Sequence, residues 1–369
     1  MKRRPTLRKA RRELRYWDEP NRNSASLGCS RCVDLGLCGG LHVAGSAFDC
    51  TSYCCGNKSA CNSVCPRNDS FVDRVREVTG FDLNRIDRLA PHGFPMLPAS
   101  IPLVYSKGRR IEPFKSTAAA ISLFQLFERA NGGRRFDDRS AVCNYFGIDR
   151  ETALVVSGTG PDAPLERWWS LGERRLEILA HIVDLRVVAA TAPNFSVFSD
   201  VPRWDNFHAM KRIAICWAEM VSAGIPTALH VNARTSQDWR RWTDFVRTRD
   251  EVAAISYEFA TGAAGPYRLP FHVDELRHLA DRVKRPLKLV VRGAIGALDD
   301  LRQSFAHVTM LDSTTYMKTV NRKIGEFREG RLVWKDAPGR PAVCLHELFE
   351  HNHLTMLGAA SPHPVRPSS

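Results

Sequence analysis

The sequence predicts an α/β protein: a TIM-like parallel β/α barrel preceded by a small cysteine-rich metal-binding module. Eight of the eleven cysteines lie between residues 29 and 65 of the 369-residue chain. From residue 101 onward, short apolar runs alternate with amphipathic helical segments. Apolar strands separated by helices are typical of a parallel sheet covered on both faces. An open doubly wound parallel sheet is the alternative.

Composition divides the chain into five segments. We expect a basic arm at 1–22, the cysteine-rich module at 23–88, a linker at 89–100, the barrel-like domain at 101–336 and a flexible tail at 337–369. Four prolines between residues 90 and 102 mark the linker. No apolar run reaches the roughly 18 residues that a membrane helix needs, and no secretory signal follows the N-terminus. We therefore expect a cytoplasmic protein with no membrane partner.

The basic arm indicates a polyanion binder. It carries nine Lys or Arg against three acidic residues, within a formal net charge of +13. Each phosphate that such an arm neutralises releases condensed counterions, which favours binding. A solvated tail that only aids solubility is the alternative. The side chains expected to contact DNA or RNA are Arg3, Arg4, Arg8, Lys9, Arg11, Arg12 and Arg15.

The cysteine cluster indicates a metal centre, because a reducing cytoplasm disfavours structural disulfides. Four thiolates complete one tetrahedral zinc site or hold one four-iron cluster, so eight suffice for two centres. The predicted ligands are Cys29, Cys32, Cys38, Cys50, Cys54, Cys55, Cys61 and Cys65. The isolated cysteines, Cys143, Cys216 and Cys344, are expected to be packing residues.

The spacing favours one or two 4Fe-4S iron–sulfur clusters over zinc. Cys61, Cys65 and Pro66 form a C-x3-C-P run that echoes the end of a bacterial ferredoxin motif. Only Cys29 and Cys32 have the C-x2-C spacing common in zinc sites, so zinc is the alternative. Four disulfides in an exported module are a further alternative.

Seven apolar runs predict barrel strands, and an eighth strand is expected within residues 141–148. The runs are 101–105, 153–158, 187–192, 226–231, 252–260, 286–291 and 307–312. A helix is expected to open at Asp162 and Pro164, another to close on Gly224, and a third to begin with a capping box from Thr235 to Asp238. A hairpin at 326–336 and a short helix in the tail follow.

Residues 187–293 resemble a known family. "APNFSVFSDVP", "AGIPTALHV", "AISYEF" and "LVVRG" occur there in order. This pattern is similar to an uncharacterised domain-of-unknown-function family of phage and bacterial genomes, whose hallmark reads P-D-F-S-hydrophobic-aromatic-x-D-x-P. Asn194 stands where the family has Asp, and "HVNA" replaces a Trp-containing segment. The resemblance implies a phage or bacterial context and a barrel-like fold, without a reaction.

Candidate catalytic residues lie at the carboxyl ends of the predicted strands, where parallel α/β folds carry their sites. His230 and Glu258 each interrupt an apolar strand, which costs free energy inside a barrel unless the side chain has a partner. They are predicted to form an acid/base pair, with Arg292 holding an anion such as phosphate. Asp200 is the fourth candidate, with helix capping as its alternative role.

The leading hypothesis is a nucleic-acid-directed protein whose arm and metal module grip DNA or RNA. Its barrel pocket binds and processes or modifies a base or nucleotide. A non-catalytic, metal-stapled nucleic-acid-binding or adaptor protein is the alternative, favoured by Asn194 in place of the family's Asp. The sequence leaves open whether the chain is an enzyme, because one barrel fold hosts many chemistries.

Overall fold

The computed structural model describes residues 74, 76–128, 132–198, 203–261, 263–328, 331–338 and 344–362. All seven predicted nucleic-acid-binding residues of the arm and all eight predicted cysteine ligands lie outside the described residues. The candidate Asp200 also lies outside them.

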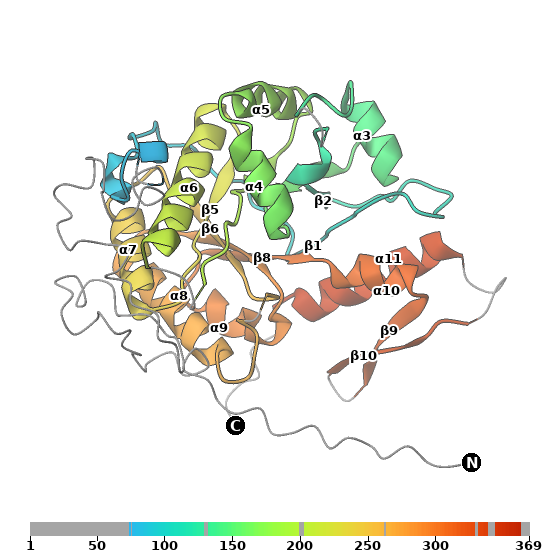
Figure 1. Ribbon diagram of the computed structural model, residues 1–369. Helices are drawn as coiled ribbons and strands as arrows, with labels where there is room; N and C mark the ends of the chain where they lie inside the picture. Colours follow the sequence, from blue (N-terminus) through green and yellow to red (C-terminus); the bar gives the residue numbers. More distant parts are fainter. Residues whose placement is uncertain are drawn as a thin grey trace, which may run out of the picture.

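Eight parallel strands form the centre of the molecule (Figure 1). Their order is β1-β8-β7-β6-β5-β4-β3-β2. Leu103 bridges Ala120 in parallel, and the Val104 amide donates to the Ala120 carbonyl at 2.8 Å, so the edge strands β1 and β2 meet. The predicted barrel is confirmed, and the open-sheet alternative is wrong because the sheet curls back on itself. The strands are β1 (Ser100–Pro102), β2 (Ala118–Ser122), β3 (Ala153–Ser157), β4 (Ala189–Thr191), β5 (Thr227–His230), β6 (Ala254–Glu258), β7 (Lys288–Arg292) and β8 (His307–Asp312).

The eighth strand lies elsewhere than predicted. It is β2, with the sequence AAAIS. Alanine has weak strand propensity, so this run gives little signal. Most of residues 141–148 lie in helix α3 (Arg139–Phe146), whose buried side chains Val142, Cys143 and Phe146 follow a helical spacing.

Helices cover the outside of the barrel. They are α4 (Asp162–Ser170), α5 (Arg174–Asp184), α6 (Arg203–Ser222), α7 (Ser236–Arg247), α8 (Leu269–Val283), α9 (Leu298–Arg302) and α10 (Thr314–Val320). Short 3-10 turns occur at Leu83–Arg85, Leu123–Gln125 and Ile295–Ala297. The capping box of Thr235 and Asp238 at the start of α7 is confirmed. Gly172, with φ +56°, separates α4 from α5.

The C-terminal region belongs to the barrel. The predicted hairpin is confirmed as β9 (Lys323–Arg328) and β10 (Arg331–Asp336). Helix α11 (Leu345–Ala360) follows, and its Phe349 ring contacts the Phe114 ring edge-to-face at 4.7 Å. Residues 103–117, which connect β1 to β2, contain no helix, and α11 packs beside β1 (Figure 1). The expected flexible tail is therefore wrong for residues 345–360.

The expected linker closes the amino-terminal end of the barrel. Phe94 and Leu97 are buried among the side chains inside the barrel. The Lys288 ammonium donates to the Phe94 carbonyl, and His307 Nε2 lies 2.6 Å from the Leu97 carbonyl oxygen. The alanines on the inner face of the strands leave room for these two side chains; they are Ala118, Ala120, Ala189, Ala228 and Ala254. Because this end is plugged, the carboxyl end of the strands is where a site can open.

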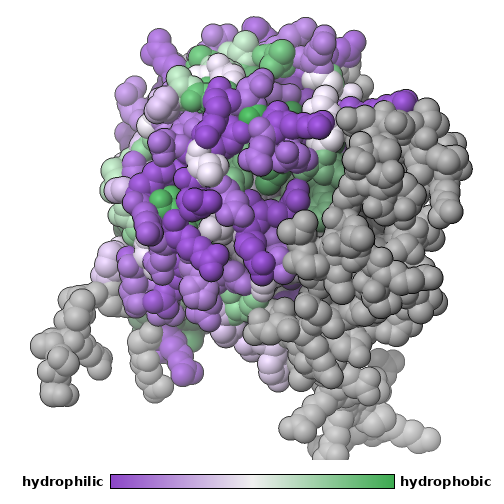
Figure 2. All heavy atoms as spheres, turned by 90° about the vertical axis from the view of Figure 1, so that its left-hand side faces the viewer, coloured by the Kyte–Doolittle hydropathy of each residue, from purple (hydrophilic) through white to green (hydrophobic). Residues whose placement is uncertain are grey.

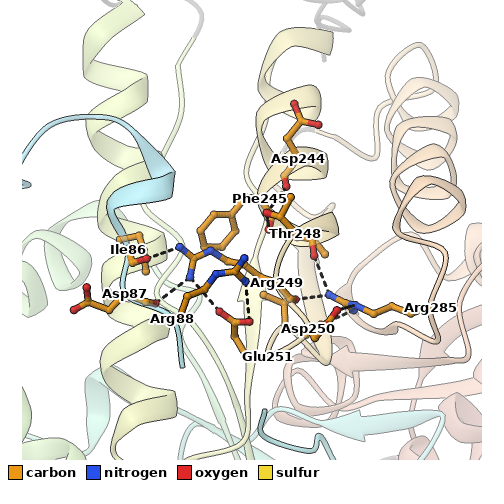
Figure 3. Close-up of polar contacts among 12 residues, drawn as sticks. Ile86, Asp87, Arg88, Asp244, Phe245, Thr248, Arg249, Asp250, Glu251 and Arg285 are labelled. Carbon is orange, nitrogen blue, oxygen red and sulfur yellow. Dashed lines mark hydrogen bonds and ion pairs between the residues drawn. The ribbon is translucent and has the colours of Figure 1, made fainter. Parts of the chain in front are cut away.

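The segment just before the linker is held against α6 and α7 by long cationic side chains. The Lys211 ammonium donates to the Asp82 carbonyl at 2.6 Å. Arg249 reaches the carbonyls of Ile86 and Asp87 and pairs with Glu251 at 3.1 Å (Figure 3). Residues 81–88, assigned to the cysteine-rich module from sequence, therefore pack on the barrel.

The face of the molecule that lies on the left in Figure 1 is turned toward the viewer in Figure 2. Its described surface is mostly hydrophilic, with small apolar areas between the hydrophilic side chains. Among the described residues, no helix has both the length and the apolar character required to span a bilayer.

Candidate active site

Adjacent strands bring a carboxylate and an arginine together at the carboxyl end of the barrel. Glu258 of β6 and Arg292 of β7 are register partners. Ala254 and Val290 of the same strands belong to the cluster inside the barrel. Since side chains alternate along a strand, Glu258 and Arg292 also lie on the inner face. Two of the predicted site residues are thus neighbours at the mouth.

The Glu258 carboxylate is buried and accepts two hydrogen bonds. Its side chain is 2% exposed, and Oε2 accepts from Arg292 Nη1 at 3.3 Å. Oε1 accepts from the Ala260 amide at 2.8 Å. Burial raises the pKa of Glu258 to about 7, and the Arg292 charge opposes this rise. A carboxyl group that titrates near neutral pH can both take up and release a proton.

A cavity of about 530 Å³ adjoins this pair, and a second of about 190 Å³ shares three of its residues. We call them the larger and the smaller chamber. Arg292 lines the larger chamber and Glu258 the smaller one. Among the described residues, no acidic side chain lines the larger chamber. Its polar lining consists of Tyr105, Ser122, Gln125, Thr159, Arg167, Thr261 and Arg292.

His230 lies one layer deeper than Glu258. It is the register partner of Ser256, and its Nδ1 is 3.1 Å from the Ser256 hydroxyl. Burial lowers the pKa of His230 to about 3, so the imidazole is neutral at physiological pH. His230 lines neither chamber. The structure does not bring it into contact with Glu258, which bonds Arg292 and Ala260 instead, and His230 has the character of a satisfied core histidine.

Asn194 and Asn232 meet in the smaller chamber. Asn232, from the "HVNA" segment, donates to Asn194 Oδ1 at 2.9 Å and to the Phe195 carbonyl at 2.9 Å. Both asparagines line the chamber. Both asparagine side chains are uncharged amides. Among the described residues that line the smaller chamber, Glu258 therefore supplies the negative charge.

Glycines allow the backbone to pass close beside the site. A Cβ on Gly158 would lie 2.5 Å from the Thr191 carbonyl oxygen. Gly293, which follows Arg292, has φ +82°, and a Cβ there would lie 3.1 Å from the Ala260 nitrogen. That nitrogen is the donor to Glu258, so Gly293 permits the approach that holds the carboxylate.

Several residues of the site were not predicted from the sequence. Tyr105 is the last residue of the first predicted strand. Arg167 lies within helix α4, and Arg234 lies in the loop after β5, so neither is at the end of a strand. Gln125 follows the unrecognised strand β2. Asp312, another strand-end carboxylate, accepts from the Thr314 amide at 2.7 Å, in the first turn of α10, whose N-cap residue is Ser313.

No group of three or more His, Cys, Asp or Glu suited to a metal occurs in the part of the chain that the structure describes. Cys143 and Cys216 are buried packing residues, as expected. Cys344 differs, because its sulfur accepts from the Glu347 amide at 3.4 Å and caps α11.

The fold and site therefore define a parallel β/α barrel with an acid–arginine pair at its carboxyl mouth. No protein-family model matches the sequence, and no curated protein matches it either. Among solved structures, the chain is similar to a candidate lyase/mutase from Burkholderia cenocepacia J2315. The sequences are 13% identical, the match covers 68% of this chain and 86% of that one, and the TM-score is 0.34. At this level the similarity does not bear on function.

Proposed function

We propose that this protein is a barrel enzyme that transfers a proton to or from a base or nucleotide, held through an anionic phosphate group, at the carboxyl end of the strands. The observation that carries the proposal is Glu258, buried at the mouth beside Arg292, with burial raising its pKa to about 7. Buried strand-end carboxyls poised near neutral pH are suited to general acid/base catalysis.

The chamber lining supports an anionic substrate. Arg167 and Arg292 face the larger chamber, and Arg234 lines the smaller one. Arginine presents a planar fork of donors that matches phosphate and carboxylate groups. Asn194, Asn232 and Ser196 supply neutral hydrogen-bonding groups to the smaller chamber. In this assignment Glu258 moves the proton, while the arginines hold the anion.

The N-terminal region carries the nucleic-acid part of the proposal. The basic arm would bind the phosphate backbone of DNA or RNA. The cysteine-rich module would hold one or two iron–sulfur clusters, or zinc, and help bind the polymer. The protein would be of phage or bacterial origin and act in the cytoplasm. Anaerobic purification with iron, sulfide and zinc analysis tests this part. Iron and sulfide support a cluster, zinc supports a structural site, and absence of all three contradicts the metal module.

The catalytic part is tested by comparing cells that express wild-type protein, Glu258→Gln or Arg150→Gln. DNA and RNA are digested to nucleosides and analysed by mass spectrometry. We expect an altered nucleoside with wild type that is lost with Glu258→Gln. Arg150 is exposed and precedes β3 at the opposite end of the barrel, so Arg150→Gln should match wild type. Identical digests from wild type and empty-vector cells would contradict an enzyme acting on nucleic acid.

A second candidate is a non-catalytic nucleic-acid-binding or adaptor protein. It is favoured by Asn194, which stands where the resembling family has Asp and which accepts a hydrogen bond from Asn232. If Glu258→Gln binds nucleic acid as tightly as wild type, and neither alters a nucleoside, this candidate is supported instead.

A further inference from the structure

Glu258 and Arg292 form an ion pair across the boundary between the two chambers. The Arg292 side chain is 21% exposed, whereas the Glu258 side chain is 2% exposed. An anion in the larger chamber therefore meets Arg292 and not the carboxylate. The same guanidinium then faces two competing negative groups, one fixed in the protein and one brought by the ligand.

The charged and titratable groups around this pair are few among the described residues. Tyr105, which follows β1, feels the charges of Arg292, Glu258 and Asp312, and Tyr257 of β6 feels those of Arg234, Arg268 and Glu258. Arg234 lines the smaller chamber beside Glu258. Burial raises the pKa values of Tyr105 and Tyr257, so both phenols are neutral near pH 7. Burial raises the pKa of Glu258, and the charge of Arg292 is the largest effect that lowers it and so favours the ionised carboxylate.

We infer that an anion bound in the larger chamber neutralises Arg292 and causes the buried Glu258 carboxylate to take a proton from solvent. Binding of the substrate's anionic group would thus load the catalytic acid in the neighbouring chamber. In this step one proton moves from solvent to a carboxylate oxygen of Glu258, and no other bond of the protein or the anion forms or breaks. The inference rests on the proposed function, because it assigns Glu258 its protonated state in the substrate complex.

The direction in which anion binding changes the pKa of Glu258 follows from two opposing effects on this carboxyl group. Burial favours the neutral carboxylic acid, and the Arg292 charge favours the carboxylate. When the Arg292 charge is shared with a bound anion, the opposing effect weakens, so the pKa of Glu258 rises above about 7. By linkage, the anion must then bind more tightly as the pH falls.

Sulfate is the probe, because it does not itself titrate near pH 7. Calorimetric titration of the full-length protein at pH 7.5, in two buffers of different ionisation enthalpy, measures protons taken up per sulfate bound. Wild type should take up a large fraction of one proton, and its sulfate dissociation constant should rise by up to about tenfold per pH unit above pH 7. Glu258→Gln should bind sulfate with no uptake and no such pH dependence.

Two variants separate the contributions of the arginines. Arg167→Gln should weaken sulfate binding but keep the proton uptake per bound sulfate, because Arg167 lines the larger chamber and Glu258 does not. Arg292→Gln should lose both. Arg150→Gln, the exposed control at the far end of the barrel, should match wild type in both measurements.

Sulfate binding by wild type without proton uptake would overturn the inference, as would equal uptake by Glu258→Gln or absence of sulfate binding. These results leave the nucleoside-digest comparison unaffected. If a Glu258-dependent altered nucleoside is found and uptake is absent, only the anion coupling fails. If no altered nucleoside is found, the proposed catalytic function fails even where sulfate drives proton uptake.

Discussion

Glu258 shows how one buried side chain links chemistry to stability. Its ordinary pKa is 4.5, and burial raises it to about 7 in the folded protein. A group whose folded pKa is raised stabilises the fold fully below the unfolded value, and this contribution is lost as the pH rises through the folded value. The carboxyl that suits proton transfer therefore makes the protein less stable at neutral pH than at mildly acidic pH.

Replacing Glu258 with Gln tests this linkage. Between pH 4.5 and about 7, the wild-type free energy of unfolding should fall relative to that of Glu258→Gln, because the amide never ionises. Denaturant unfolding of both proteins across this range gives the difference. If wild type instead gains stability relative to the variant as the pH rises, the carboxylate is favoured by its surroundings and the assigned direction is wrong.

Gly293 tests the backbone approach that holds Glu258. Gly293→Ala must adopt φ +82° with a Cβ 3.1 Å from the Ala260 nitrogen. A strained residue of this kind costs about 1 to 3 kcal/mol. Gly172→Ala, at φ +56° with nothing within 4 Å of its Cβ, is the matched control for backbone conformation alone. We expect thermal unfolding to show the larger loss for Gly293→Ala; equal losses would mean that the close approach is unimportant.

Among the elements, α11 shows how a remote segment completes the barrel. The β1–β2 connection has no helix, and α11 covers β1 from the other end of the sequence. Ser116, in that connection, lies 3.2 Å from His353 of α11, and the Arg110 guanidinium lies 4.5 Å from the centre of the Phe349 ring. Sequence patterning predicts a helix here but not its docking, since docking depends on a partner more than 200 residues away.

Phe349→Ala should destabilise the whole barrel if α11 is integral to it. The ring is 0% exposed, and truncating such a phenylalanine costs about 3 to 5 kcal/mol. Leu354→Ala is the control on the same helix, because Leu354 is 65% exposed and surface changes stay within about 0.5 kcal/mol. Denaturant midpoints provide the measurement, and similar small losses in both variants would show that α11 contributes little to the fold.

For the assembled barrel, the segment that precedes β1 is a structural part and not a spacer. Lys211, Arg241 and Arg249 donate to carbonyls of residues 81–87. Phe94 and Leu97 then plug the amino-terminal end. Residues 81–97 are therefore joined to the barrel through buried contacts.

Arg249→Met removes the central donor of these contacts. It leaves the carbonyls of Ile86 and Asp87 without this donor and breaks the buried pair with Glu251. Breaking a buried ion pair from one side costs about 3 to 5 kcal/mol. Glu251 keeps its ion pair with Arg88 at 3.3 Å, so we expect a loss near the lower end of this range in denaturant unfolding. The control Arg247→Met removes an exposed pair with Asp244 and should cost under about 1 kcal/mol. A similarly small loss for Arg249→Met would contradict the role of this cluster.

The sequence by itself determined the barrel, seven of its strands, the α7 capping box, and the placement of Glu258 and Arg292 at strand ends. These features depend on local periodicity and on the rule that parallel strands end at one face. The tertiary structure decided the rest. It showed β2, whose alanines carry no pattern, and it placed His230 one layer below Glu258. It also joined Arg167, Arg234 and Tyr105 to the mouth, because residues distant in sequence meet only when the sheet closes.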